Sequence, residues 1–176
     1  MEPTMKYPFN VRSFFTDRET KDIGSGIVLW RGYFQSVRPG IGKMLINVDI
    51  STGTMYKPGS LIMLCLDFLG RANQNNPNML APKKGFPDRE RIRLQRFLQG
   101  IRIVTNHVGE SGQVNRTPRV VKKLSAAGAN DLSFPLREGG TQTVAQYFRR
   151  TQNNQPLRFP DVICVEVRSS PSKQTV

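Results

Sequence analysis

Residues 27–50 decide the first part of the fold, and they contain three stretches: Ile27-Val-Leu-Trp-Arg-Gly-Tyr-Phe34, Ser36-Val-Arg-Pro-Gly-Ile-Gly42 and Lys43-Met-Leu-Ile-Asn-Val-Asp-Ile50. The first stretch is apolar and β-branched without a helical period, which predicts a strand bent at Gly32. The second is rich in turn residues. One face of the third carries Met44, Ile46, Val48 and Ile50. Because side chains of a strand alternate between its faces, we expect the two outer stretches to form an antiparallel hairpin.

Four further segments surround this hairpin. Tyr7 to Phe15 is expected to be extended, and the charged stretch Thr16 to Gly24 is expected to be a turn. After the hairpin, Thr52 to Gly59 is rich in breaker residues and predicts a domain boundary. The compact apolar run from Leu61 to Leu69 fits a strand or a short helix, and its pattern does not distinguish the two.

The following region contains a loop and a helix. Arg71 to Pro87 is rich in Asn, Pro and Gly, has no hydrophobic period, and predicts a surface loop. Asp88 is expected to be the N-cap of a helix over residues 88–99 that stops at Gly100. Its narrow apolar stripe favours packing on a core over binding to a lipid surface.

The remaining segments predict strands and one more helix. Strands are expected over residues 101–107, 119–124, 132–136 and 161–167. Thr141 or Thr143 should cap a helix with Val144, Tyr147 and Phe148 on one side. The chain is therefore predicted to be an α+β protein.

The charge of the chain indicates its class of partner. There are 26 Lys and Arg residues against 13 Asp and Glu among 176 residues, which gives a formal charge of +13. An excess of this size attracts polyanions, so nucleic acid is the first candidate and an anionic membrane surface the second. No apolar run approaches the ~20 residues that cross a bilayer, and no secretory signal is visible. Cys65 and Cys164 lie in apolar runs, which predicts buried thiols in a reducing compartment.

The patterns of known catalytic sites are missing from the sequence. The aspartates are scattered singly, whereas a two-metal nuclease needs converging carboxylates. The single histidine, His107, excludes a two-histidine zinc motif. Gly40-Ile-Gly-Lys43 resembles the end of a phosphate-binding P-loop, but Met44 stands where that loop needs Ser or Thr. We therefore expect no catalytic residue, no metal and no cofactor.

A set of cations, one imidazole and aromatic rings lies between residues 101 and 158. Single-stranded nucleic acid is held by such a set, because bases stack on aromatic rings while cationic and polar side chains donate to phosphates. Each member also has an ordinary explanation as core or solvated surface. The set consists of His107, Arg116, Arg119, Lys122, Lys123, Phe134, Tyr147, Arg149, Arg150 and Arg158.

Specific motifs resemble the Argonaute family. Phe34-Gln-Ser-Val-Arg-Pro39 with Asn47-Val-Asp-Ile-Ser51 resembles its first linker domain. Several stretches resemble its PAZ domain in order along the chain: Ile103-Val-Thr-Asn-His-Val-Gly109, Arg116-Thr-Pro-Arg-Val120, Leu132-Ser-Phe-Pro-Leu136, Thr143-Val-Ala-Gln-Tyr-Phe148, and Leu157-Arg-Phe-Pro160 to Cys164-Val-Glu-Val167. The resemblance implies a linker 1-like domain over residues 1–59 and a PAZ-like domain over 60–176. It implies a fungal-type fragment whose PAZ domain is incomplete at the C-terminus, with a disordered tail over 168–176.

The resemblance also implies a fold and a site. The linker would be a β-hairpin segment, followed by an OB-like open β-barrel with an inserted β-hairpin and helix. In the family the cleft between barrel and insert anchors the 3′ end of a small guide RNA. His107, Arg116 and Tyr147 would contact the terminal phosphate region, Phe134 would stack on the terminal base, and Arg119 would add charge. Thr151-Gln152 replaces a Lys-Tyr pair of the family, and Arg149 and Arg150 would compensate for the lost charge.

The expected function is a non-catalytic RNA-binding module of the RNA-silencing pathway. Its partner would be the 3′ end of a small RNA, single-stranded or a two-nucleotide overhang, together with proteins of the silencing complex. No membrane partner is expected, and the location is expected to be cytoplasmic, with the nucleus as the alternative. The rival hypothesis is a truncated fragment with non-specific electrostatic RNA binding or a scaffold role.

Overall fold

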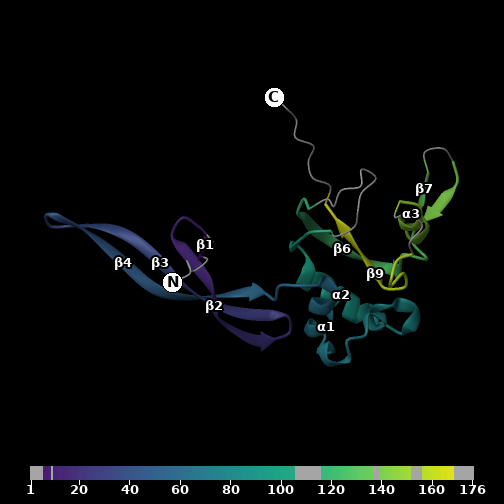
Figure 1. Ribbon diagram of the computed structural model, residues 1–176, viewed down its shortest axis with the longest axis horizontal. Coiled ribbons are helices and arrows are strands. Elements are labelled where there is room, and N and C mark those ends of the chain that lie inside the picture. The colour runs from purple at the N-terminus through teal and green to yellow at the C-terminus, as the bar shows by residue number, and fades with distance from the viewer. Residues whose placement is uncertain (1–5, 9, 106–115, 137–138, 152–155, 169–176) are drawn as a thin grey trace. The chain divides into compact units, whose positions relative to one another are not determined.

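The computed structural model describes residues 6–8, 10–105, 116–136, 139–151 and 156–168 (Figure 1). The chain divides into two compact units, Met1–Ala72 and Asn73–Val176. The predicted domain boundary after residue 59 stays a prediction. Both sheets and helices are present, and the described strands form no closed barrel, so the α+β class is confirmed.

The first unit contains an antiparallel sheet in the order β1-β2-β3-β4. The strands are β1 (Lys6–Pro8), β2 (Ser13–Gly24), β3 (Ile27–Gly40) and β4 (Lys43–Tyr56). The predicted hairpin is confirmed, but it is longer than predicted. Strands β3 and β4 pair without interruption from Ile27 opposite Tyr56 to Gly40 opposite Lys43. Pairing with β3 therefore extends β4 to Tyr56, into the segment from Thr52 whose breaker residues predicted a domain boundary.

The charged stretch from Thr16 to Gly24 was predicted to be a turn, and this prediction is wrong. These residues belong to β2, whose pairing with β3 has a register shift between Thr16 and Thr20. The reversal of the chain lies just beyond, where Gly24, Ser25 and Gly26 have positive φ. Charged side chains are compatible with this strand because most of its outer part is exposed to solvent.

Phe15 is a buried aromatic side chain of this sheet. Phe15 on β2 is only 6% exposed. A Cβ atom added to Gly32 on β3 would lie 2.5 Å from the Phe15 ring, and one added to Gly53 on β4 would lie 2.8 Å from it. The Phe15 ring therefore lies against two strands at positions where only glycine leaves room for it.

The apolar run after the sheet is a helix, α1 (Leu61–Phe68), which settles the alternative that the sequence left open. Leu64, Cys65 and Leu66 are buried. Burial raises the pKa of the Cys65 thiol to about 12, so this cysteine stays protonated.

Lys57 forms ion pairs with both the sheet and the helix. Its Nζ atom lies 2.5 Å from Asp22 Oδ2 of β2 and 3.3 Å from Asp67 Oδ2 of α1.

The second unit begins with short 3₁₀ turns. They are η1 (Ala72–Gln74, which starts at the end of the first unit), η2 (Pro77–Leu80) and η3 (Pro82–Lys84). The prediction of a surface loop for Arg71 to Pro87 is wrong here, because Leu80, Ala81 and Phe86 are buried. The burial of these three apolar side chains was not predicted, because they have no regular spacing and their neighbours in the sequence are polar or proline.

The next helix is α2 (Asp88–Leu98), as the apolar spacing predicted. The predicted N-cap is wrong, because Pro87 is the N-cap and Asp88 is the first helical residue. The Asp88 carboxylate instead forms an ion pair with Arg91 at 2.7 Å. Leu94 and Leu98 are fully buried on one side of this helix.

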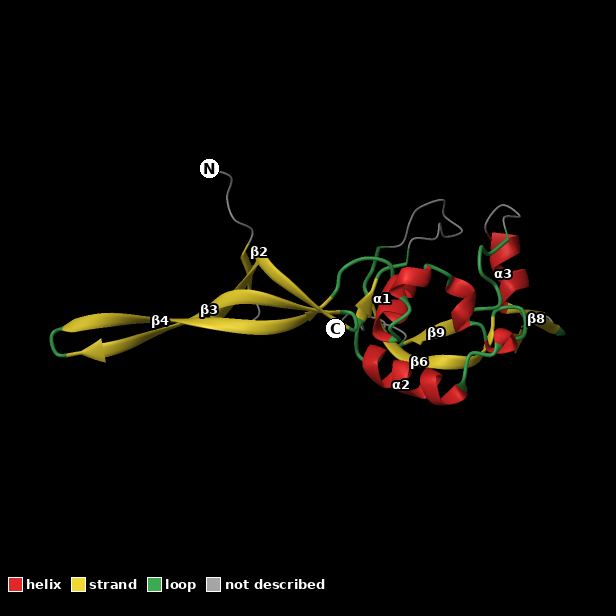
Figure 2. Cartoon of the chain, turned by 90° about the horizontal axis from the view of Figure 1, so that it is seen from below, coloured by secondary structure: helices red, strands yellow, loops and turns green. Residues whose placement is uncertain are grey.

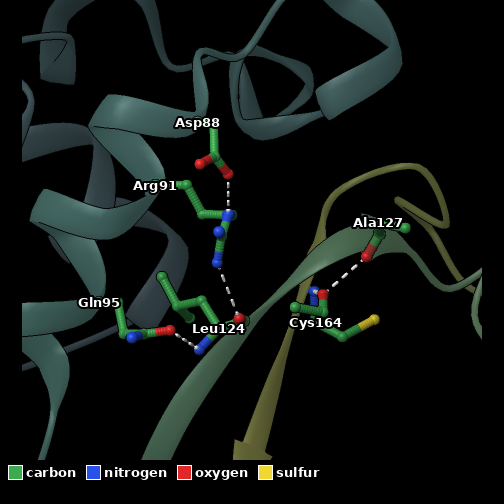
Figure 3. Close-up of polar contacts among 7 residues, drawn as sticks. Asp88, Arg91, Gln95, Leu124, Ala127 and Cys164 are labelled. Carbon is green, nitrogen blue, oxygen red and sulfur yellow. Dashed lines mark hydrogen bonds and ion pairs between the residues drawn. The ribbon is translucent and has the colours of Figure 1, made fainter.

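A three-stranded antiparallel sheet packs on this helix, in the order β5-β6-β9. The strands are β5 (Arg102–Ile103), β6 (Arg119–Gly128) and β9 (Ile163–Val167). Of the strand predicted over 101–107, only β5 is a strand among the described residues, and residues 106–107 lie outside them. Two side chains of α2 bind the Leu124 backbone of β6, as Figure 3 shows: Arg91 donates to its carbonyl at 3.2 Å and Gln95 accepts from its N–H at 3.0 Å.

A separate two-stranded sheet and a helix complete the second unit. They are β7 (Ser133–Pro135), β8 (Thr141–Thr143) and α3 (Val144–Thr151). Strands β7 and β8 pair antiparallel. Helix α3 follows β8 directly (Figure 2). This is the β-hairpin and helix that the resemblance implied as an insert. No helix of the described residues is long and apolar enough to cross a membrane.

Candidate nucleic-acid interface

A capping box holds the start of α3. The Gln146 N–H donates to Thr143 Oγ1 at 3.2 Å, and the Thr143 N–H donates to Gln146 Oε1 at 3.0 Å. This reciprocal pair satisfies backbone donors that a helix N-terminus otherwise leaves unpaired. The prediction that Thr141 or Thr143 caps the helix is thus confirmed for Thr143, because its hydroxyl oxygen accepts the Gln146 N–H. The cap fixes the direction in which the later side chains of α3 project.

Three rings meet between β7 and α3, and we call them the aromatic cluster: Phe134, Tyr147 and Phe148. The ring centroids of Phe134 and Tyr147 are 5.8 Å apart at an interplanar angle of 75°. Those of Tyr147 and Phe148 are also 5.8 Å apart, at 86°. Both pairs have the edge-to-face geometry that aromatic rings favour. Tyr147 remains 40% exposed, so the cluster presents a ring and a phenol to solvent.

Cations lie at the end of the same helix. Arg149 and Arg150 occupy the last turn of α3, both are exposed, and neither forms an ion pair with another described residue. Positive charge in a last turn is favourable because it faces the negative end of the helix dipole. Arg158, by contrast, lies 5.2 Å from the ring centroid of Phe159 in a cation–π contact.

The other predicted site residues lie on or before β6. Arg119 is the first residue of β6, opposite Ile103 of β5, and it is exposed. Arg116 is also exposed and precedes the strand by three residues. No hydrogen bond or ion pair within the described ranges joins either arginine to the aromatic cluster. His107 lies outside the described residues. The RNA-binding roles of all these side chains stay predictions.

A cavity on another side of α3 was missed by the sequence reasoning. It has a volume of about 500 Å³, and its lining includes Lys83, Asn130, Gln146, Arg149 and Leu157. None of the three rings of the aromatic cluster lines it. We call it the rear cavity. Its walls come from η3, the β6–β7 connection, α3 and the segment before β9, so no local sequence pattern indicated it.

Polar contacts hold the walls of the rear cavity together. Lys83 Nζ lies 2.6 Å from Asp131 Oδ1, and this hydrogen bond raises the pKa of Lys83 above its ordinary value. Asn130 Nδ2 donates to Asp161 Oδ1 at 2.8 Å. Among the described residues, no group of three or more His, Cys, Asp or Glu side chains could hold a metal ion.

Two family models match the chain. The Argonaute linker 1 domain matches residues 11–57, and the PAZ domain matches residues 66–176. The PAZ match alone spans more than half of the chain. The chain belongs to the Argonaute family.

Individual Argonaute relatives agree with this assignment. The rice "Protein argonaute 14" (Oryza sativa subsp. japonica) is 34% identical over 148 residues, which are 83% of this chain and 13% of that protein. The chain therefore spans only about an eighth of the length of this relative. The assignment to a fungal type stays a prediction.

Solved Argonaute structures resemble the chain as well. Kluyveromyces polysporus Argonaute, solved with a guide RNA, matches 96% of this chain and 20% of its own at a TM-score of 0.56 and 15% identity, which supports the fold. The PAZ domain of Drosophila Argonaute 2, solved to explain 3′ end recognition of nucleic acids, is 31% identical. It matches 64% of this chain and 85% of its own at a TM-score of 0.41.

Proposed function

We propose that this chain binds the free 3′ end of a small RNA, either single-stranded or a two-nucleotide overhang, at the aromatic cluster. The observation that carries the proposal is the exposed Tyr147 ring packed edge-to-face on Phe134, on the hairpin and helix of a PAZ domain. An unpaired terminal base offers a face for stacking, which a base inside a duplex does not. Binding without a catalytic step is proposed.

Each side chain has a distinct role in this proposal. Phe134 stacks on the terminal base, and the Tyr147 hydroxyl donates to the terminal phosphate region. Arg116, Arg119 and His107 supply further donors to the phosphates. Arg149 and Arg150 add positive charge at the end of α3. The cytoplasmic location and the silencing-complex proteins stay predictions.

A titration with two RNA duplexes tests the proposal. Both carry a fluorophore at a 5′ end, and they differ only in whether the 3′ ends are blunt or extend by two nucleotides. Because stacking of a base on an aromatic ring contributes about 1–3 kcal/mol, Phe134→Ala should weaken overhang binding by about 5- to 150-fold. Tyr147→Phe should weaken it less, since the ring remains. Blunt-duplex binding should not change.

A matched control variant distinguishes loss of the RNA site from a general effect of substitution on RNA binding. Tyr33→Phe removes a phenol of similar exposure on β3 of the first unit, and it should leave both affinities unchanged. Equal losses on blunt and overhang RNA in the Phe134 variant would refute specific recognition of the end.

Non-specific electrostatic binding is the second candidate function, and the formal charge of +13 favours it. Binding of this kind should weaken steeply with salt and show no preference for a free 3′ end. Titrations of the overhang and blunt duplexes at rising salt distinguish the candidates, because end recognition predicts a difference in affinity that persists as salt increases.

A further inference from the structure

The rear cavity has the size of a small-molecule site and is partly open to solvent. Its volume of about 500 Å³ lies within the range of pockets that hold small ligands and cofactors. Its walls are tied to one another: the Asn130 N–H donates to the Pro160 carbonyl at 3.2 Å, and the Ala145 N–H donates to the Ala129 carbonyl at 2.9 Å. A ligand would therefore meet a backbone that is already positioned, which lowers the entropic cost of binding.

Some polar groups that line the cavity still have hydrogen-bonding capacity for a ligand. Gln146 uses its Oε1 atom in the capping box, which leaves its amide donor available. Asn130 uses its amide donor on Asp161, which leaves its carbonyl acceptor available. Arg149 has no ion pair among the described residues. The cavity thus offers one amide donor, one amide acceptor and one guanidinium.

These groups match the parts of a nucleotide. An amide donor and an amide acceptor can pair with the edge of a nucleobase, as Asn and Gln do in nucleic-acid recognition. A guanidinium binds phosphate oxygens with paired N–H donors. Leu157 and Pro160 add an apolar wall against which a flat base can lie.

The charges around the cavity favour one phosphate over several. Lys83 is already paired with Asp131, so Arg149 is the cation left to bind an anion. The Asp131 carboxylate lines the cavity, and Asp161 lies next to it through Asn130. Each added phosphate would bring more negative charge toward these carboxylates, where like charges repel.

We propose that the rear cavity binds a nucleoside monophosphate unit, with the phosphate on Arg149 and the base between the Asn130 and Gln146 amides. The unit is either a free mononucleotide or one nucleotide of an RNA strand. The proposal does not depend on 3′ end binding at the aromatic cluster, because none of the three rings lines this cavity.

Calorimetry on the full chain with adenosine 5′-monophosphate tests the site. We expect saturable binding that is weaker for adenosine alone, for inorganic phosphate alone and for adenosine triphosphate. Arg149→Gln should weaken monophosphate binding by about tenfold, since it removes a hydrogen bond to a charged group. The matched control is Arg150→Gln, the next residue of the same exposed turn, which does not line the cavity and should bind as the wild type does.

Two results would overturn the proposal. One is the absence of saturable monophosphate binding, and the other is an equal loss in the Arg149 and Arg150 variants, which would indicate general charge attraction. Phe134→Ala should leave monophosphate binding unchanged, so failure of the aromatic cluster and failure of this site can be told apart. Circular dichroism of each variant checks that the fold is kept.

Competition identifies the source of the nucleotide. If the cavity holds a nucleotide of an RNA strand, single-stranded RNA will displace the monophosphate. If it holds a free mononucleotide, RNA will not displace the monophosphate. Either result supports a nucleotide site.

Discussion

Gln95 carries a hydrogen bond that the second unit cannot replace with water. Its Oε1 atom accepts the Leu124 N–H at 3.0 Å, and Leu124 is only 2% exposed (Figure 3). In Gln95→Leu the side chain keeps its approximate size but loses the acceptor. A buried donor without a partner costs about 1–3 kcal/mol, so we expect a loss of that size in the free energy of unfolding. For a chain of this length the expected fall in Tm is roughly 2–4 °C per kcal/mol.

Two measurements assign this loss to the second unit. Urea unfolding followed by far-ultraviolet circular dichroism reports the loss in stability, and hydrogen exchange should be faster at the Leu124 amide than in the wild type. The only tryptophan, Trp30, lies on β3 of the first unit. Its fluorescence transition should therefore stay where it is in the wild type if the two units unfold independently.

Two variants serve as controls. Gln95→Glu keeps an acceptor oxygen, lies one turn from Arg91, and should retain most of the stability. Gln99→Leu makes the same chemical change at the exposed C-cap of α2 and should cost little. The reasoning would be refuted if Gln95→Leu cost less than about 0.3 kcal/mol, or no more than Gln99→Leu, because the Leu124 N–H would then not need this acceptor.

Three further predictions concern the first unit. Gly53→Ala places a Cβ atom 2.8 Å from the Phe15 ring and should cost about 1–3 kcal/mol in thermal unfolding, while Phe15→Leu in the same chain should recover part of the loss. The hydrogen bond from Lys57 holds the pKa of Asp22 below its ordinary value of 3.8. The stability from this pair is therefore present above that value and is lost as the pH falls through the lower folded-state pKa, so urea midpoints of wild type and Asp22→Asn should converge in strong acid. Ile46 is 73% exposed on an apolar strand face, so Ile46→Lys should reduce concentration-dependent self-association in analytical ultracentrifugation without lowering Tm; unchanged association would mean that this face does not drive it.

The sequence predicted best those elements whose signals are local. The turn residues around Gly40 and Gly42 and the alternating apolar residues of β4 lie within one short segment, and they predicted the hairpin. The spacing of Leu94 and Leu98 predicted α2, and a capping threonine at position 141 or 143 predicted the start of α3. Each of these signals acts within a few residues, where hydrogen-bonding geometry depends on neighbours in the chain.

The sequence predicted poorly those features that depend on pairing between distant segments. The charged residues of β2 were predicted to form a turn, because charged side chains on a solvent-facing strand give no local pattern that indicates a strand. Leu80 and Phe86 were predicted to lie in a surface loop, because they are buried by elements elsewhere in the chain and not by their sequence neighbours. In the site, motif resemblance brought Phe134 and Tyr147 into one hypothesis. No pattern related Lys83 to Asn130, Arg149 and Leu157.

The sequence by itself determined the excess of positive charge, the α+β class and membership of the Argonaute family, since these depend on composition and on motifs of a few residues. The tertiary structure alone decided which face of α3 carries which chemistry. Tyr147 joins the aromatic cluster and Arg149 the rear cavity, although the two are separated by one residue. The helical period puts side chains two residues apart on nearly opposite sides of α3. Only the folded second unit decides which distant segments meet each side, namely β7 on one side and the residues around Lys83, Asn130 and Leu157 on the other.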